Sequence, residues 1–283
     1  LVPTGEGVGL NSACLGLIYA LECQGLKAGF LKPFSQDSSA EIDRSTALFR
    51  HLSNSTTVEP IGYTRLIQLI NAGENDELLE QAVHLHRQIS KEHDLIIVEG
   101  LVPNARDSFA GEMNAALAQA LDAHVIIVSN ADIANAEHSA EKVETQLRNF
   151  GGASCPRTAG VLFMRTRGLP EECAQIPVTM DPSLRLDKES QKFAEAIQKT
   201  HPHIGSAQLP IIAMVPFSNT LSVPRVSDLS AQIQAAWINK GEAAQRRVLH
   251  NSLISANIQY ELDKFVAGEL IISAAQRTDT LLA

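Results

Sequence analysis

The chain has 283 residues, of which 45% are hydrophobic, enough to bury the core of one large domain and part of a second. A net charge of −9 and an aromatic content of 5% disfavour nucleic acid and anionic membranes as partners, because both need a basic surface and single strands also need stacking rings. The apolar runs are too short to cross a membrane and the first residues lack a signal-peptide pattern, so we expect a cytoplasmic protein.

The cysteines and histidines form no pattern that is typical of a metal site or a disulfide framework. The chain has four cysteines and nine histidines, and the cysteines show no C-x-x-C spacing. Such scattered cysteines are typical of reduced thiols that pack as small apolar groups in an intracellular protein. The sequence therefore predicts no metal ligands.

The first predicted elements are a short apolar strand, a glycine-rich turn and a helix over residues 10–24 that stops at Gly25. This order of strand, loop and helix is the context of the Walker A phosphate-binding loop, G-x-x-x-x-G-K-[ST]. Because the chain starts at Leu1 rather than at a methionine, we also expect the first strand to be shortened.

The loop lacks the residues that carry phosphate chemistry. With Gly9 as the second glycine of the motif, the pattern requires glycine, lysine and a hydroxyl where this chain has Thr4, Leu10 and Asn11. The motif lysine contacts the terminal phosphates, and the motif hydroxyl holds Mg²⁺. We therefore expect a degenerate Walker A loop, in which binding of a nucleotide with Mg²⁺ is disfavoured.

Two interpretations of the loop remain open. Glycine-rich turns also occur where a helix simply packs closely on a strand, and that needs no ligand. Alternatively, backbone N–H groups and the helix dipole can still bind an anion after the side chains are lost. The candidate ligand-binding residues of the loop are Thr4, Gly5, Gly7, Gly9, Asn11 and Ser12.

Short apolar strands alternate with amphipathic helices along the rest of residues 1–243. The predicted strands cover residues 27–33, 94–99, 125–129, 158–164 and 211–216. The predicted helices cover residues 75–93, 112–121, 137–150, 188–200 and 228–240, with a short helix after the polar stretch 35–44 and an irregular loop over 166–186. This alternation predicts a three-layer α/β/α P-loop-NTPase-like parallel sheet, with the strand 94–99 fully buried.

Two charged residues stand at the carboxyl ends of predicted strands, where open α/β sheets bind their ligands. Lys32 precedes Pro33, and Glu99 precedes Gly100. The lysine could reach a ligand or lie exposed at the edge, and the carboxylate could hold Mg²⁺ through water or cap a loop. We keep Lys32 and Glu99 as candidate ligand-binding residues.

The alternation changes after residue 243. A predicted strand over 248–255, a helix near 259–268, a strand over 269–274 and a turn at 276–280 follow in close succession. This pattern predicts a partial second α/β domain over residues 244–283. We expect that domain to be cut short, and the chain to be a fragment of a longer protein.

Several motifs along the chain resemble those of one family. They are P-T-G-x-x-V-G-L-x-S at residues 3–12, F-L-K-P at 30–33, V-E-G-L-V-P at 98–103, F-G-G-A at 150–153 and A-G-E-L-I-I-S-A-A-Q-R-T-D at 267–279. Together they resemble the N-terminal region of long bacterial phosphate acetyltransferases, over essentially the whole chain. That region is similar in turn to dethiobiotin synthetase, whose strand-end lysine and glutamate match Lys32 and Glu99, whereas its loop lysine and hydroxyl are not matched by Leu10 and Asn11.

The resemblance implies a domain organisation and a function. Residues 1–243 correspond to a dethiobiotin-synthetase-like P-loop domain and 244–283 to the start of a DRTGG-type domain, while the C-terminal transferase domain is absent. The parent enzyme interconverts acetyl-CoA and phosphate with acetyl phosphate and CoA, and uses CoA or acetyl-CoA as its substrate. The fragment is therefore expected to have no catalytic residues and to tune activity and assembly. Its expected partners are the other domains of the same enzyme, further copies in a homo-oligomer and a small-molecule effector.

Two other functions are compatible with the residues. Lys32 and Glu99 also fit an ATP-dependent, dethiobiotin-synthetase-like enzyme that acts on a carboxylate or forms an amide. A non-enzymatic adaptor is the further alternative.

Overall fold

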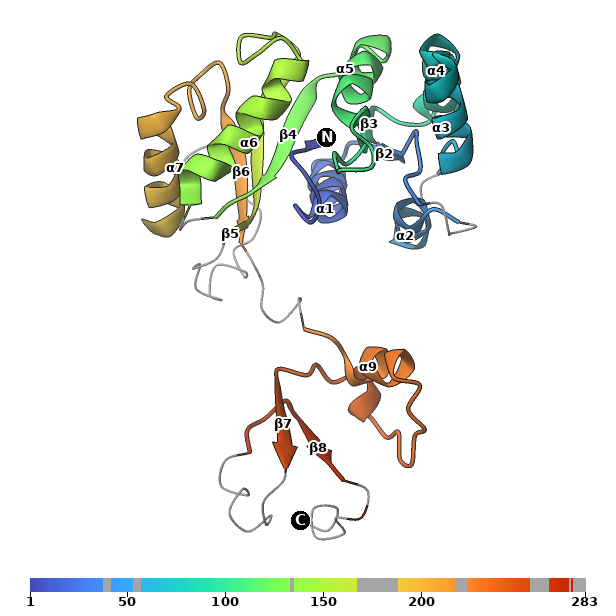
Figure 1. The fold of residues 1–283 in the computed structure, drawn as a ribbon, viewed down its shortest axis with the longest axis vertical. Helices are drawn as coiled ribbons and strands as arrows, with labels where there is room; N and C mark the ends of the chain where they lie inside the picture. Colours follow the sequence, from blue (N-terminus) through green and yellow to red (C-terminus); the bar gives the residue numbers. More distant parts are fainter. Residues whose placement is uncertain are drawn as a thin grey trace. The chain divides into compact units, whose positions relative to one another are not determined.

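A computed structural model describes residues 1–37, 42–52, 57–132, 135–166, 188–216, 223–254, 265–274 and 276 (Figure 1). The chain divides into two compact units, Leu1–Phe217 and Ser218–Ala283. The candidate site lies in the first unit.

The first unit is built on parallel strands. Strands β1 (Val2–Pro3), β4 (Val125–Asn130), β5 (Thr158–Thr166) and β6 (Ile211–Pro216) form one sheet in the order β1-β4-β5-β6. Strands β2 (Ala28–Leu31) and β3 (Leu95–Val98) form a second parallel pair. Leu1 connects the two pieces, because its amino group donates to the Val98 carbonyl oxygen at 2.7 Å and its own carbonyl oxygen accepts from the Gly100 N–H at 2.9 Å.

Seven helices of the first unit, among the residues described, surround these strands (Figure 1). They are α1 (Leu10–Cys23), α2 (Arg44–Leu52), α3 (Tyr63–Ala72), α4 (Asn75–Ser90), α5 (Ala110–Ala120), α6 (Ala136–Asn149) and α7 (Lys188–Thr200). Their positions and order agree with the predicted alternation of strands and helices, and α3 is a helix that the sequence pattern had not indicated.

The buried side chains show that helices cover both faces of the sheet. On one face, Leu147 of α6 and Ile197 of α7 pack with Ile127 and Phe163 of the strands. On the other face, α1 packs with Val128 and other strand residues. The successive residues Ile127 and Val128 of β4 thus face opposite helical layers, as the pleat of a strand requires. The predicted three-layer α/β/α fold is confirmed.

Glycines set both ends of α1. Gly9 precedes the helix with φ of 86°, and Gly25 follows it with φ of 83°, in the left-handed region that favours glycine. The N–H of Gly25 donates to the Glu22 carbonyl oxygen at 2.9 Å, and the N–H of Leu26 donates to that of Leu21 at 3.2 Å. The predicted helix over 10–24 and its stop at Gly25 therefore agree closely with the structure.

Some local predictions differ from the structure. Strand β3 is not fully buried, because Leu95 at its start is 41% exposed. The helix predicted over 228–240 is the shorter α9 (Val226–Gln232), which ends where Gln234 adopts φ of 54° and departs from helical geometry. Most of the predicted irregular loop 166–186 lies outside the described residues.

The second unit contains α9, the short 3-10 helix η3 (Ala243–Gln245) and two parallel strands, β7 (His250–Ile254) and β8 (Glu269–Ser273). The two strands fall within the predicted ranges 248–255 and 269–274. Most of the helix predicted near 259–268 and of the turn at 276–280 lies outside the described residues.

The units divide at residue 217, earlier than the boundary predicted at residue 243. The reason is that the start of α9 pairs with the segment after η3. Arg225 and Arg247 form an antiparallel bridge, and the Val226 N–H donates to the Arg246 carbonyl oxygen at 3.0 Å. The assignment of the two regions to a P-loop domain and a DRTGG-type domain stays a prediction.

Candidate functional site

The glycine-rich loop runs from the end of β1 to the start of α1. Thr4 is fixed to β4, because its N–H donates to the Val128 carbonyl oxygen at 2.9 Å and its hydroxyl donates to Ser129 Oγ at 3.1 Å. Gly7 has φ of 68°, and a Cβ added at Gly5 or Gly7 would meet nothing within 4 Å. The loop backbone is therefore open on the side of these two glycines.

The three residues that open α1 have different environments. Leu10 is only 6% exposed and packs in the apolar core between α1 and the strands. The Asn11 side-chain amide donates to Ser45 Oγ at 3.0 Å. Ser12 is exposed and takes no part in this contact. Leu10, at the position of the Walker A lysine, thus packs in the apolar core. Asn11, at the position of the Walker A hydroxyl, directs its amide at Ser45 of helix α2.

Four side chains form what we call the buried ion cluster: Lys32, Asp43, Ser45 and Glu99. Lys32 Nζ lies 3.1 Å from Asp43 Oδ2, 3.2 Å from Glu99 Oε1 and 3.2 Å from Ser45 Oγ. Ser45 Oγ donates to Glu99 Oε1 at 2.9 Å. One lysine is therefore shared by two carboxylates at short range, and Asn11 joins the cluster through Ser45.

The fold explains why these residues meet. Lys32 directly follows β2 and Glu99 directly follows β3, and neighbouring parallel strands end at the same edge of a sheet. Asp43 lies at the start of α2, where its Oδ1 accepts from the Thr46 N–H at 3.0 Å as a helix cap. Ser45 lies in the first turn of the same helix.

Helix α2 is held against β2 by an aromatic pair. The rings of Phe30 in β2 and Phe49 in α2 are stacked, with centroids 3.6 Å apart and an interplanar angle of 7°. Both side chains are fully buried. This contact places the first turn of α2, with Asp43 and Ser45, over the ends of β2 and β3.

The environment shifts the pKa of each charged group of the cluster. Burial lowers the pKa of Lys32, but the charges of Glu99 and Asp43 raise it by more, so its net pKa lies above the ordinary value. Burial raises the pKa of Asp43, but the Thr46 N–H and the Lys32 ammonium outweigh it, so the net pKa is lowered. Burial also raises the pKa of Glu99. Lys32 and Ser45 lower it by less than burial raises it, so the net pKa of Glu99 lies above the ordinary value.

Of the two carboxylates, Glu99 thus has the environment that is less favourable for the charged form. Its Oε2 atom is buried and has no hydrogen-bond partner among the described residues. An unpaired carboxylate oxygen in a buried position favours the protonated form. The raised pKa of Glu99 follows from this geometry.

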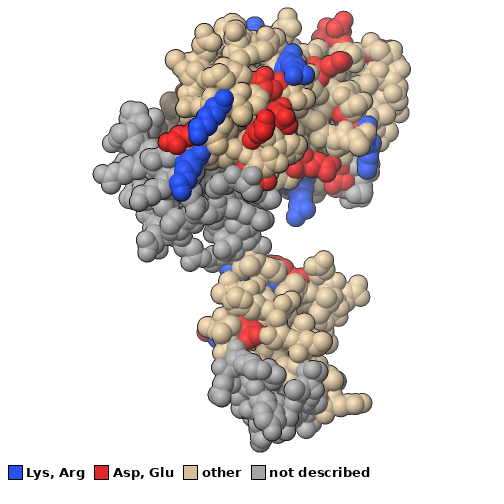
Figure 2. All heavy atoms as spheres, turned by 60° about the vertical axis from the view of Figure 1, so that its left-hand side comes forward, with Lys and Arg blue, Asp and Glu red and all other residues tan. Residues whose placement is uncertain are grey.

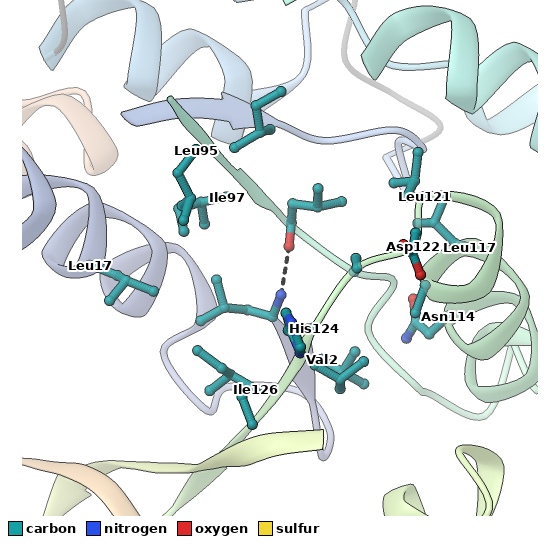
Figure 3. Close-up of a pocket in the computed structure, with 18 of the residues that line it drawn as sticks. Val2, Leu17, Leu95, Ile97, Asn114, Leu117, Leu121, Asp122, His124 and Ile126 are labelled. Carbon is teal, nitrogen blue, oxygen red and sulfur yellow. Dashed lines mark hydrogen bonds between the residues drawn. The ribbon is translucent and has the colours of Figure 1, made fainter. Parts of the chain in front are cut away.

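The segment after Glu99 is tightly packed. A Cβ at Gly100 would lie 2.9 Å from both the Leu1 carbonyl oxygen and Asn114 Oδ1, so only glycine fits there. The buried Asn114 side chain accepts from the Leu101 N–H and donates to the Leu101 carbonyl oxygen, both at 2.8 Å. The segment at Gly100 and Leu101 is therefore fixed by direct contacts to Leu1 and to Asn114 of α5, which is labelled in Figure 3.

Of the candidate residues from the sequence, the structure brings Asn11, Lys32 and Glu99 together. Thr4, Gly5, Gly7 and Gly9 form the adjoining loop, and Ser12 points away into solvent. Sequence reasoning missed Asp43, near the end of the stretch 35–44 that it described only as polar, and Ser45, in the short helix predicted to follow. Asp43 could have been predicted from its place directly before a short helix, because acidic residues are common at the N-cap position of a helix.

The residues present do not fit a nucleotide with Mg²⁺. Leu10 offers no charge to phosphates, Asn11 offers an amide in place of the metal-binding hydroxyl, and both carboxylates already pair with Lys32. Among the described residues, no three or more His, Cys, Asp or Glu side chains are grouped so that they could hold a metal ion. None of the described helices combines the length and apolar character needed to span a membrane.

The surface in Figure 2 carries separate acidic and basic side chains rather than one basic area, as far as the described residues on this face show. With a net charge of −9, the chain lacks the excess of positive charge that phosphate backbones attract.

Comparison with known proteins shows the family. The family model described as "AAA domain" matches residues 1–225. Over its full length, the chain is 61% identical to the phosphate acetyltransferase of Acinetobacter baylyi, 32% to that of Haemophilus influenzae and 30% to that of Escherichia coli. It covers 39%, 40% and 40% of these relatives, so it spans about two fifths of their length.

The relatives match along the whole length of this chain. The match to the family model and the parallel α/β architecture agree with one another. This chain therefore belongs to the AAA domain family and is homologous to the N-terminal region of phosphate acetyltransferases.

Proposed function

We propose that this chain is the regulatory and assembly region of a phosphate acetyltransferase, whose parent enzyme interconverts acetyl-CoA and phosphate with acetyl phosphate and CoA. The observation that carries the proposal is the buried ion cluster. Where a P-loop enzyme needs free charges for phosphates and Mg²⁺, Lys32 of this chain pairs with Asp43 and Glu99. In this proposal the charges of Lys32, Asp43 and Glu99 stabilise the fold instead of binding a ligand, and the domain has a structural role.

Cys14, the most buried thiol among the described residues, supports a non-catalytic role. Cys14 lies in the core of the first unit and is fully buried. Burial raises the pKa of the Cys14 thiol, and the nearby Glu99 carboxylate raises it further. A neutral, inaccessible thiol is a poor nucleophile for acyl transfer. The proposal therefore assigns acetyl transfer, and the CoA site, to other domains of the parent enzyme.

We also propose binding partners and a cellular location for this chain. The other domains of the same enzyme, further copies in a homo-oligomer and a small-molecule effector are the proposed partners, and the cytoplasm is the proposed location. The open loop at Gly5 and Gly7 is the proposed contact region for the effector, because its backbone N–H groups and the α1 dipole favour an anion.

A deletion in the full-length phosphate acetyltransferase tests the regulatory role. We expect an enzyme without residues 1–217 to keep acetyl transfer, because the proposal assigns that chemistry elsewhere, and to change its oligomeric mass or its response to metabolite effectors. Transfer rates and light scattering, with and without candidate anionic effectors, measure both. An enzyme with unchanged mass and unchanged effector response would contradict the proposal. Complete loss of acetyl transfer from a folded enzyme would place catalysis in this region.

The second candidate is an ATP-dependent enzyme related to dethiobiotin synthetase, which the positions of Lys32 and Glu99 at the sheet edge favour. Titration calorimetry of this chain with Mg²⁺ and ATP decides between the two. We expect no binding heat at millimolar ATP, because the loop has Leu10 where the phosphate-binding lysine belongs. Saturable heat that disappears in a Lys32→Met variant, and persists in the Lys27→Met control, would instead support the ATP-dependent enzyme.

The adaptor alternative differs from the regulatory role in one observable property. An adaptor binds its partner without influence on acetyl transfer, whereas a regulatory region changes the rate or the assembly of the enzyme that contains it. The deletion experiment therefore separates these two functions as well.

A further inference from the structure

Helix α4 has an exposed, charged outer face at one edge of the first unit, where it lies beside α3 (Figure 1). The inner face of the helix is buried through Leu78, Ala82 and Ile89. Residues spaced by three or four positions lie on one side of an α-helix. The exposed residues with this spacing, which we call the outer face of α4, are Asp76, Glu80, His84 and Arg87.

The charges of the outer face of α4 are divided along the helix. Asp76 and Glu80 lie in the N-terminal half, and His84 and Arg87 lie in the C-terminal half. The helix dipole favours acidic residues in the first turn and basic residues in the last. It does not explain Glu80 in the second turn, which also repels Asp76 four residues before it. The division of charge therefore calls for a further explanation.

The charged residues of the outer face have no counter-charge within the part of the chain that the structure describes. None of the ion pairs of the first unit includes Asp76, Glu80 or Arg87. The adjacent Glu77, by contrast, pairs with Arg65 of α3. The charge of Glu77 is thus compensated inside the chain, whereas the charges of the outer face are available to a partner.

Apolar surface accompanies these charges. Leu79 and Val83 are half-buried on α4. Together with Ile61 they line a shallow hollow of about 1020 Å³ that follows the helix over residues 76–87. A second helix can place its side chains in a hollow of this kind, as packed helices do. Such apolar contacts are needed at an interface, because exposed ion pairs alone contribute little.

We propose that the outer face of α4 is the contact surface between two copies of this chain, with the two α4 helices antiparallel across a two-fold axis. An axis near residue 82 places Asp76 of one copy opposite Arg87 of the other, because these residues lie about equally far from it along the helix. The same axis places Glu80 opposite His84. Two-fold symmetry repeats each pair, so the face is complementary to itself.

A second copy is the occupant that the charge pattern favours. A net charge of −9 makes two copies repel each other over much of their surfaces. The outer face of α4 carries both signs, and only the antiparallel arrangement brings opposite signs together at both ends. A parallel arrangement would place Asp76 against Asp76 and Arg87 against Arg87. Leu79 and Val83 lie between the two charged halves, so the antiparallel arrangement brings them to the centre of the contact.

The inference rests on the proposed assembly role, because it names the surface through which copies would associate. A contact made mainly by one pair of helices is smaller than a standard protein–protein interface, so the dimer should be weak. Sedimentation equilibrium of this chain at about 1–300 µM should therefore show a monomer–dimer equilibrium. Added salt should weaken the dimer, because it screens exposed charges.

Two charge reversals locate the surface. Arg87→Glu and Asp76→Arg each place like charges opposite each other at both ends of the contact, so each should raise the dissociation constant of the dimer about ten-fold or more. The matched controls on α7 are Lys192→Glu and Glu195→Arg, which make the same changes of net charge at exposed positions and should leave the dimer intact. Circular dichroism checks that each variant is folded.

An equimolar mixture of the two reversed variants tests the antiparallel arrangement. In the mixed dimer, the arginine introduced at position 76 faces the glutamate introduced at position 87, and the native Asp76 and Arg87 face each other. We expect the mixture to form a heterodimer about as tightly as the parent chain forms its dimer. The double variant Asp76→Arg, Arg87→Glu should dimerise by itself for the same reason, and it gives a second measurement if one single variant does not fold.

The outcomes separate this surface from the proposed function. A chain that stays monomeric over the whole concentration range would overturn the pairing and leave the outer face of α4 to a different partner. A dimer that Arg87→Glu weakens no more than Lys192→Glu does, or one that neither the mixture nor the double variant restores, would also overturn it. If the dimer behaves as expected but deletion of residues 1–217 leaves the mass and effector response of the full enzyme unchanged, the regulatory and assembly role fails and this surface stands.

Discussion

A Lys32→Met variant of this chain is expected to lose about 3–5 kcal/mol of its free energy of unfolding at neutral pH, the usual cost of removing one partner from a buried ion pair. Lys32 is the cation that lies within 3.2 Å of both Asp43 and Glu99. Methionine keeps most of the side-chain volume but leaves two buried carboxylates without a positive partner. Urea unfolding, followed by circular dichroism, measures the loss.

The loss should depend on pH in a defined direction. Without Lys32, the pKa of Glu99 rises further above its unfolded value and the pKa of Asp43 loses the lowering that Lys32 provides, so folding of the variant favours protonated carboxyls more than folding of the parent chain does. The variant then keeps its stability below about pH 4 and loses it as the pH rises through the raised pKa values. In the parent chain Asp43 has a lowered pKa, so its contribution is present above pH 4 and is lost in acid. The difference between the two proteins therefore grows from pH 4 to pH 7.

Two control variants make this prediction specific. Lys27→Met removes an exposed lysine just before β2 and should change the free energy of unfolding by about 0.5 kcal/mol or less. The triple variant Lys32→Met, Asp43→Asn, Glu99→Gln removes all three charges and should recover much of the loss. Equal effects of Lys32→Met and Lys27→Met would show that the buried ion cluster does not stabilise the fold.

A Phe49→Ala variant is expected to lose about 3–5 kcal/mol of the free energy of unfolding, the usual cost of removing a buried aromatic side chain. Phe49 is fully buried and its ring is stacked on that of Phe30 at 3.6 Å. The substitution removes the contact that holds α2 on β2, and it leaves a cavity in the core. Thermal and urea unfolding measure the loss.

The same helix offers a matched control. Leu52→Ala removes an apolar side chain that is 59% exposed, so it should cost well under 1 kcal/mol. If Phe49 positions the first turn of α2, its loss should also weaken the coupling between Lys32 and Asp43. A double-mutant cycle for these two residues, in the Phe49→Ala background, should then give a smaller interaction energy. Similar losses for Phe49→Ala and Leu52→Ala would contradict the anchoring role.

Much of the fold could be predicted because its signals are local. The helix over 10–24 is bounded by glycines, and the strands of the first unit are continuous aliphatic runs whose type does not depend on distant residues. Helix α3 and the exposure of Leu95 could not be predicted in this way. Burial of Leu95 depends on what lies on the inner side of β3, and the sequence of β3 itself does not contain that information.

The sequence by itself determined that the Walker A loop lacks its lysine and hydroxyl, and that Lys32 and Glu99 stand at the ends of strands. Only the tertiary structure showed that these two residues pair with each other, and that Asp43 and Ser45 complete the cluster. The physical reason is that the stacking of Phe30 on Phe49 places α2 over the strand ends, and this contact joins residues that no local pattern connects.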